Sequence, residues 1–169
     1  MLIYARHSQF HPDDDSAHAV LAYAVGTVGV EHGASLIFIA HTPTPDLTSS
    51  ECTVILAGHT HCGGAAACLK AHNEGTPITA TATPLSRWLA PLSRLIAALD
   101  LSATHADKAL DRIVAENVRR QVANICEAEP VKKAWADGKS LSVHGWVYDL
   151  ASGRIKDLEV TRGPGSEGA

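Results

Sequence analysis

The sequence predicts an α/β fold, with a small, mostly parallel sheet flanked by helices, because short apolar runs alternate with amphipathic stretches. Two apolar runs, at residues 36–40 (LIFIA) and 53–57 (TVILA), have the length of buried strands. Between about residues 107 and 128, apolar side chains recur every three to four positions, which is typical of an amphipathic helix. Strands and helices that alternate in this way pack as layers around one core.

The first half of the chain carries further helix signals. The acidic run DDDS at residues 13–16 suits a helix N-terminus, because negative charge and hydroxyl acceptors stabilise the free amides there, and Gly33 is expected to end that helix. The Ala-rich segment from Gly63 predicts a second helix. Pro84 predicts the start of a third, which Pro91 should kink or split.

The C-terminal part predicts a short helix followed by a β-hairpin. Pro130 opens the helix and Gly138 ends it. The stretches SLSVHGWVYDL and GRIKDLEV read as two strands joined by an Ala-Ser-Gly turn. We expect one domain over residues 1–162 and a disordered tail over residues 163–169.

Composition narrows the classes of function and location. The chain has 169 residues, of which 46% are apolar and 19% charged, as expected for one globular domain. A net charge of −4, with no run of Lys or Arg, argues against nucleic acid or an anionic membrane as partner. No apolar stretch approaches the roughly 18–20 residues of a membrane span, and no signal peptide is recognisable. We therefore expect a cytoplasmic location, or an organelle matrix, and no disulfide framework among the four cysteines.

The segment VILAGHTHCGG at residues 54–64 is the best candidate for chemistry. His59 and Cys62 are three positions apart after a strand, and imidazole and thiolate are typical zinc ligands. Gly63 and Gly64 allow close backbone approach, and their amides lie at a helix N-terminus, where a small anion can bind. Alone, the H-x-x-C spacing is a weak signal that occurs often by chance. His61 between the two is expected to be a solvated loop residue.

This segment resembles the zinc-binding strand and turn of β-carbonic anhydrases. Three further stretches resemble the same family in the same order, so that residues 9–32 and 53–162 match. They are the helix DDDSAHAVLAYAVGTVGVEH, the helix segment AENVRRQVANI and the closing hairpin VHGWVYDLASGRIKDLEV, in which H-G-W-x-Y-D is distinctive. In this family the hairpin is scaffold.

The resemblance implies a function and a set of site residues. His59 and Cys62 correspond to two of three Zn²⁺ ligands, and Gly63 and Gly64 to the turn beside the CO2 or bicarbonate pocket. The implied reaction is reversible hydration of CO2 to bicarbonate by zinc-bound hydroxide, because zinc lowers the pKa of its bound water to about 7. The family's dimer-interface sites imply a homodimer or a larger homo-oligomer.

The sequence departs from the family in the remaining ligand. The family takes it from an upstream C-x-D-x-R motif, whose Asp and Arg control the fourth zinc position, and none of the four cysteines begins such a motif. It is as if the first strands of the family fold were missing. Two protein ligands hold zinc less well than three, so we expect weak zinc binding and low or absent CO2 hydration by this chain alone.

A second departure is the segment at residues 33–52, where the family runs almost directly from helix to zinc strand. It is either an insertion whose strand replaces the lost central one or translated non-coding sequence. Cys52 should lie near the far end of its strand, more than about 20 Å from the metal, which makes it a poor ligand. His41 could approach the metal if the two strands pair in parallel.

Three functions remain open at this stage. The first is a carbonic anhydrase acting on CO2 or on a relative such as COS or CS2. The second is a non-catalytic homologue that pairs with intact carbonic anhydrases and regulates them. The third is a small zinc-binding or redox-responsive module that uses His59, Cys62 and a nearby thiol. The missing C-x-D-x-R separates the first function from the other two.

Overall fold

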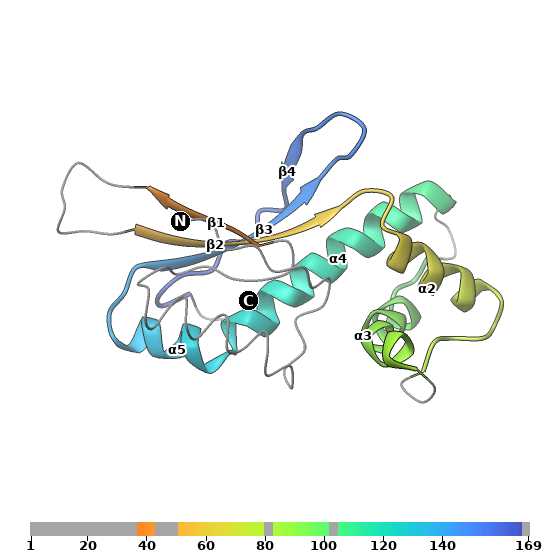
Figure 1. Cartoon of the computed structure of the whole chain (residues 1–169), viewed down its shortest axis with the longest axis horizontal. Helices are drawn as coiled ribbons and strands as arrows, with labels where there is room; N and C mark the ends of the chain where they lie inside the picture. The colour runs from red at the N-terminus through yellow and green to blue at the C-terminus, as the bar shows by residue number, and fades with distance from the viewer. Residues whose placement is uncertain (1–36, 43–50, 80–82, 102–104, 167–169) are drawn as a thin grey trace. The chain divides into compact units, whose positions relative to one another are not determined.

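The computed structural model describes residues 37–42, 51–79, 83–101 and 105–166 (Figure 1). The helix predicted before Gly33 lies outside these residues, as does most of the segment that follows it. The described residues divide between two compact units. The first unit contains the described residues up to Ala57, Val118–Trp146 and the described residues from Asp157 onward. The second unit consists of Gly58–Asn117 and Val147–Lys156. The prediction of a single domain over residues 1–162 stays a prediction.

Four helices and four strands are described. The strands are β1 (Ile37–Thr42), β2 (Glu51–His59), β3 (Leu141–Tyr148) and β4 (Ile155–Asp157). The helices are α2 (Gly63–Asn73), α3 (Pro84–Ala98), α4 (Ala106–Cys126) and α5 (Glu129–Ala136). The α/β class predicted from the sequence is confirmed, and each predicted element within the described residues is present.

The strands form one mixed sheet in the order β1-β2-β3-β4. Strand β1 pairs with β2 in antiparallel register, with Ile37 opposite Leu56 and His41 opposite Cys52. Strands β2 and β3 run in the same direction (Figure 1). The segment at residues 33–52 therefore contributes β1, which pairs with the N-terminal part of β2 in the antiparallel direction.

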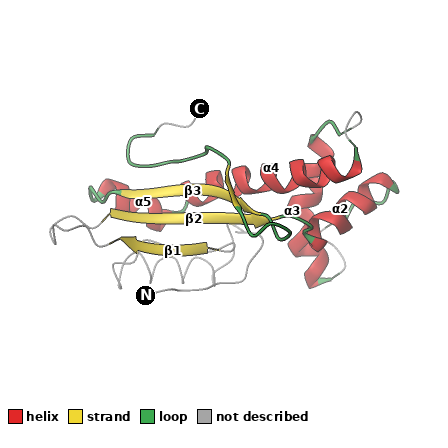
Figure 2. Ribbon diagram, turned by 90° about the horizontal axis from the view of Figure 1, so that it is seen from above, coloured by secondary structure: helices red, strands yellow, loops and turns green. Residues whose placement is uncertain are grey.

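In the first unit, one face of the sheet packs on α4 and α5 (Figure 2). Every second residue at the start of β3 is buried, and Leu141 and Val143 are fully buried. Gly145 continues this face. A Cβ added to it would lie 2.6 Å from Val160 Cγ2 and 3.1 Å from the side chains of Val118 and Val122. The glycine is needed because the helix and the chain after β4 approach the strand too closely for any side chain.

The second unit has its own apolar core, in which α2 and α3 pack together with the first half of α4. The buried side chains of this core are Ala65, Cys68, Leu89, Leu92, Ile96, Ile113 and Val114. Pro84 begins α3 as predicted, and Thr83 and Ser86 form a reciprocal capping box before it. Pro91 lies inside α3, which continues past it to Ala98 as one helix.

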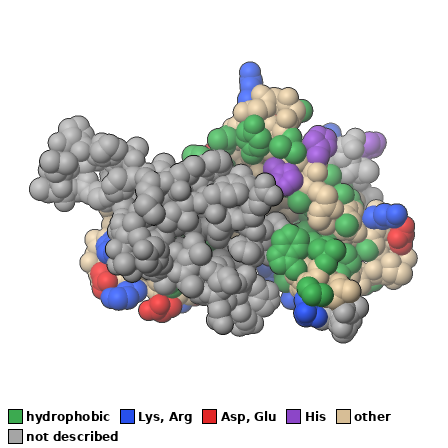
Figure 3. Space-filling model, viewed as in Figure 1, with side chains coloured by type: hydrophobic (Ala, Val, Ile, Leu, Met, Phe, Trp, Pro, Cys, Tyr) green, Lys and Arg blue, Asp and Glu red, His purple; other side chains and the backbone are tan. Residues whose placement is uncertain are grey.

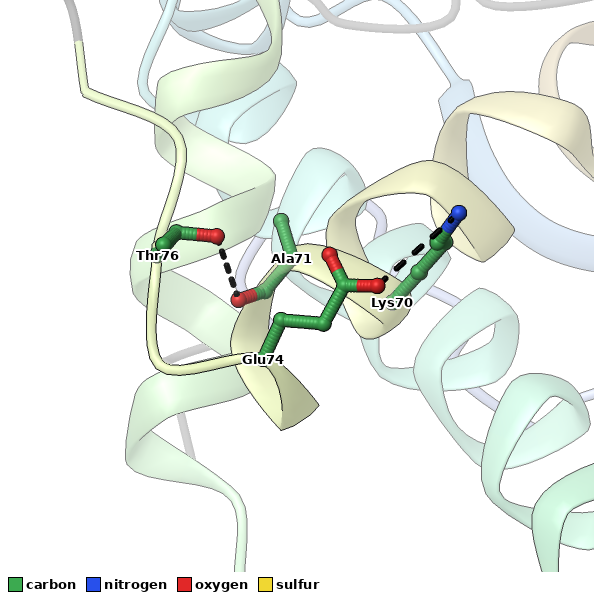
Figure 4. A network of polar contacts seen from close by, with 4 residues as sticks. All are labelled: Lys70, Ala71, Glu74 and Thr76. Carbon is green, nitrogen blue, oxygen red and sulfur yellow. Dashed lines mark hydrogen bonds and ion pairs between the residues drawn. The ribbon is translucent and has the colours of Figure 1, made fainter.

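Helix α2 ends in a Schellman motif, and Figure 4 shows this end of the helix, with the hydroxyl of Thr76 beside the carbonyl of Ala71. The amide of Gly75 donates to the carbonyl of His72, and the amide of Thr76 donates to the carbonyl of Ala71. Gly75 has a φ of +70°, a left-handed conformation that glycine adopts without steric cost. The last carbonyls of α2 are thus satisfied within the protein.

The predicted hairpin is confirmed at β3 and β4. The amide of Asp149 donates to the carbonyl of Arg154, and the amide of Gly153 donates back to Asp149 O, both at 2.8 Å. Past β4, Val143 and Arg162 form an antiparallel bridge, and residues 163–166 of the tail predicted to be disordered form a hydrogen-bonded turn. None of the described helices combines the length and hydropathy that a membrane span requires.

Candidate metal-binding turn

The candidate site is the turn between β2 and α2. Strand β2 ends at His59, and Cys62 occupies the N-cap position of α2 with φ −64° and ψ 115°. His61 has a φ of +57°, which reverses the chain within the turn. Gly63 and Gly64 are the first two residues of the helix. The four residues singled out from the sequence thus lie together in one strand–turn–helix connection.

The ring of His59 presents one nitrogen for a metal. Its Nδ1 lies 2.9 Å from the carbonyl oxygen of Thr60. A carbonyl oxygen only accepts hydrogen bonds, so Nδ1 carries the proton and Nε2 has the free lone pair. In metal-binding histidines, a hydrogen bond from the ring nitrogen that does not bind the metal commonly fixes the tautomer in this way.

The cysteines differ in what their surroundings allow. Cys62 is half-buried at the turn, and its side chain makes no capping hydrogen bond. Cys68, two turns into α2, is fully buried, and its thiol lies 3.9 Å from the carbonyl of Leu89. Burial and the nearby Cys62 raise the pKa of Cys68 to about 11. Burial likewise raises the pKa of Cys126 to about 11. Cys68 therefore has the properties of an inert core thiol, and the half-buried Cys126 is likewise kept protonated by its surroundings.

The two glycines are not equivalent. A Cβ added to Gly63 would meet no atom within 4 Å. A Cβ added to Gly64 would lie 3.3 Å from Leu89 Cδ2 and 4.0 Å from Cys62 Sγ. A side chain at position 64 would therefore require Leu89 on α3 to shift, whereas the space beside Gly63 is open.

Contacts from the hairpin hold this turn, and they were not predicted from the sequence. The amide of Thr60 donates to the carbonyl of Tyr148 at 3.0 Å. The hydroxyl of Thr60 accepts from the amide of Leu150 at 3.0 Å and donates to Asp149 Oδ1 at 3.4 Å. The signal in the sequence was a hydroxyl directly after His59 and a carboxylate directly after Tyr148, at the ends of two strands.

The other ligand candidates lie at the far end of β2. Because β1 and β2 are antiparallel, His41 is opposite Cys52, near the start of β2, whereas His59 is its last residue. The idea that His41 approaches the metal required parallel strands and is wrong. Seven residues of strand separate Cys52 from His59, or about 23 Å at 3.3 Å per residue.

The donor types at the turn fit zinc, but the described residues supply an incomplete set. Imidazole nitrogen and thiolate sulfur are preferred zinc ligands, and a catalytic site uses three protein ligands. Among the residues that the structure describes, no group of three His, Cys, Asp or Glu side chains is placed to hold a metal. His59 and Cys62 therefore form at most two thirds of a catalytic ligand set.

Comparison with known proteins identifies the family. The family model for carbonic anhydrases matches residues 49–155. A carbonic anhydrase of Pseudomonas aeruginosa is 42% identical over 64 residues, which cover 37% of this chain and 29% of that protein. The structure is similar to a Coccomyxa β-carbonic anhydrase solved in complex with acetazolamide, with a TM-score of 0.65 and 27% identity over 90% of this chain.

A second structural neighbour is a tetrameric β-carbonic anhydrase from Sordaria macrospora, with a TM-score of 0.60 and 26% identity over 90% of this chain. The chain covers 58% of the Coccomyxa protein and 64% of the Sordaria protein, so it spans less than two thirds of these relatives. The family match includes β2, the turn, all four described helices and most of the hairpin. The chain belongs to the β-carbonic anhydrase family.

Proposed function

We propose that this chain takes part in the reversible hydration of CO2 to bicarbonate, with His59 and Cys62 as two zinc ligands. The observation that carries the proposal is the β2–turn–α2 connection, which brings both donors together inside the region that matches the family. Gly63 and Gly64 are the proposed substrate-binding residues. The open space beside Gly63 supports this role, because a small anion can approach the helix amides there.

The chain's own residues have limited roles in this proposal. Nε2 of His59 and Sγ of Cys62 would hold the metal, and the core of the second unit fixes the helix on which Cys62 lies. A zinc ion held there would supply Lewis-acid chemistry, lowering the pKa of a bound water to about 7. We propose that the chain alone binds zinc weakly and turns over slowly, because two ligands hold the metal less well than three.

The first test is zinc binding, measured by competition with a chromophoric chelator. We expect weak binding by the purified chain, and loss of about tenfold or more in affinity for His59→Ala and for Cys62→Ser. His72→Ala and Cys126→Ser are matched controls, since these residues lie outside the turn, and should bind as the unsubstituted chain does. Equal affinity in all five proteins would contradict the ligand assignment.

The second test is CO2 hydration by stopped flow. Turnover by the purified chain that collapses in Cys62→Ser would support an enzyme that is complete in itself. The absence of C-x-D-x-R from the 169 residues favours a second candidate, a non-catalytic partner that pairs with intact carbonic anhydrases and regulates them. Co-purification with such an enzyme and a changed rate in the mixture, without turnover by the chain alone, would support that candidate.

We further propose that the chain forms a homodimer or a larger assembly in the cytoplasm or an organelle matrix. The tetrameric relative from Sordaria macrospora supports an assembly. Hydrophobic side chains also reach the visible surface of the described residues (Figure 3). On the hairpin, Leu150 is 54% exposed and Ile155 is 56% exposed. Light scattering coupled to size-exclusion chromatography would measure the mass, and a monomer at micromolar concentration would contradict the assembly.

A further inference from the structure

The turn between His59 and Cys62 is held in a conformation that the local sequence does not favour. His61 has a φ of +57° and an exposed side chain that makes no hydrogen bond among the described contacts. A non-glycine residue is disfavoured in this left-handed region, because its Cβ comes too close to the following carbonyl oxygen. Such a residue persists only where the surroundings determine its conformation, so contacts elsewhere must hold this turn.

Thr60 supplies those contacts, because each of its polar groups is engaged. Its amide donates to Tyr148 O, and its carbonyl accepts from Nδ1 of His59. Its hydroxyl accepts from the amide of Leu150 and donates to Asp149 Oδ1. One residue therefore links the imidazole of His59 to the end of β3, although 89 positions separate Thr60 from its carboxylate partner.

Asp149 is itself fixed on the hairpin. Its Oδ1 accepts from the amide of Ala151 at 2.9 Å, and its Oδ2 accepts from the hydroxyl of Ser152 at 2.8 Å. These hydrogen bonds, first among them the one from Ala151, hold the pKa of Asp149 below its usual range. The carboxylate is thus a rigid, ionised acceptor for the Thr60 hydroxyl at neutral pH.

We propose that Thr60 and Asp149 are positioning residues, which hold the His59–Cys62 turn in its ligand-presenting conformation before any metal binds. The hairpin is then part of the site, in addition to its role as scaffold. The carbonyl of Thr60 orients the ring of His59 directly. The contacts of Thr60 with the hairpin also fix the backbone conformation of the turn that leads to Cys62. The proposal rests on the assignment of His59 and Cys62 as ligands, but the order of the metal-free turn can be tested separately.

The variants follow from the contacts. Thr60→Val removes the hydroxyl and keeps the branched side chain, whereas Thr60→Ser keeps the hydroxyl. Asp149→Ala removes the carboxylate. Thr76→Val is the matched control, because the Thr76 hydroxyl also bonds a polar group, the carbonyl of Ala71 at 3.4 Å, but at the opposite end of α2.

The first readout uses metal-free protein, in which amide hydrogen exchange of residues 58–66 and alkylation of Cys62 are followed by mass spectrometry. A hydrogen bond to a charged group contributes enough that its loss should speed local opening by about tenfold. We expect about tenfold faster exchange and faster alkylation of Cys62 in Thr60→Val and Asp149→Ala. Thr60→Ser and Thr76→Val should retain the rates of the unsubstituted chain. Unchanged rates in Thr60→Val and Asp149→Ala would overturn the proposal.

The second readout is zinc affinity, with the melting temperature as the control for global unfolding. We expect the zinc dissociation constant to rise by about tenfold in Thr60→Val, because the metal must then order the turn. If zinc binds the unsubstituted chain and Thr60→Val equally well, the proposal that Thr60 positions the turn for zinc is wrong, whereas the assignment of His59 and Cys62 as ligands stands. If the unsubstituted chain binds no zinc but Thr60→Val loosens the turn, the conformational role stands and the ligand assignment fails.

Discussion

The two ends of helix α2 are built in opposite ways. At the C-terminal end, the backbone satisfies its own carbonyls through Gly75 and Thr76, and Lys70 and Glu74 lie beside this end on the helix surface (Figure 4). At the N-terminal end, Cys62 makes no capping hydrogen bond and the first turn carries no acidic residue. The first amides of a helix have no partners within it, so they depend on water or a ligand at this end.

This difference is what we expect between a helix end that is only structural and one that has the proposed ligand-binding role. An ordinary N-terminus carries Ser, Thr, Asp or Asn as cap, and substitution of such a cap by a residue that cannot bond costs about 1 kcal/mol. The chain forgoes that stabilisation at Cys62, beside two glycines, and obtains the order of the turn from Thr60 and the hairpin. The N-terminus of α2 has no side-chain cap and is ordered by contacts with the hairpin. The thiol of Cys62 and the first amides of the helix are therefore available to a ligand.

The largest expected effect comes from the core that supports both ends. Ile113 is fully buried among α2, α3 and α4. Ile113→Ala should lower the free energy of unfolding by about 2–5 kcal/mol, because it removes buried methyl groups and leaves a cavity. Leu85→Ala, at a position 61% exposed near the start of α3, is the matched control and should cost less than about 0.5 kcal/mol. Urea denaturation measures the free energy of unfolding of both variants. Similar losses in the two would show that the core around Ile113 does not stabilise α2.

The next effect distinguishes the two thiols on the helix. Cys62 is half-buried at the N-terminal end of α2, whereas Cys68 is fully buried with a pKa raised to about 11. Because the thiolate is the reactive form, we expect Cys62 to be alkylated at least about 100-fold faster than Cys68 at pH 8, in the folded and metal-free chain. Peptide mass spectrometry measures both rates, and urea should abolish the difference. Comparable rates in the folded chain would contradict the burial of Cys68.

The same raised pKa predicts a pH dependence of stability. The unfolded thiol ionises near its ordinary pKa of 9.0, whereas the folded thiol keeps its proton to about 11. This contribution to stability is therefore complete below pH 9 and lost as the pH rises through 11. The free energy of unfolding should fall less steeply between pH 9 and 11 in Cys68→Ala than in the unsubstituted chain. Equal slopes would show that Cys68 is not responsible.

Substitution of one glycine at each end compares the two ends directly. Gly75→Ala should cost about 1–2 kcal/mol, because alanine is strained at a φ of +70°. Gly63→Ala should change stability by less than about 0.5 kcal/mol, because its Cβ meets no atom within 4 Å. Thermal unfolding of the two variants measures the difference. A larger cost at Gly63 would mean that the N-terminal end is structurally closed, which would contradict its proposed role.

Local signals predicted most of the secondary structure. Pro84 marked the start of α3, Gly138 follows the end of α5, and an Ala-Ser-Gly turn marked the hairpin, because each of these residues restricts or permits particular backbone conformations. The H-x-x-C spacing likewise located the turn. These features depend on a few neighbouring residues, so the sequence alone was sufficient to predict them.

Pairing between distant segments was not predictable in the same way. The run at β1 is apolar without alternation, so it carries no signal for the direction in which it pairs with β2, and the pairing proved antiparallel. The contact between Thr60 and Asp149 joins residues 89 positions apart. Both depend on how the chain folds back, which local composition does not encode. The consequence for the site was that His41 was misjudged and Thr60 was missed.

The smallest expected effect concerns the charges at the C-terminal end of α2. Lys70 and Glu74 form an exposed pair at 3.9 Å, and such pairs contribute about 0.3–0.5 kcal/mol. Lys70 also interacts favourably with the helix dipole there, whereas Glu74 interacts unfavourably with it. Lys70→Gln should therefore cost up to about 0.5 kcal/mol, and Glu74→Gln should cost almost nothing. Urea denaturation in low and high salt would measure both. A larger cost for Glu74→Gln would show that the ion pair, and not the dipole, stabilises this end.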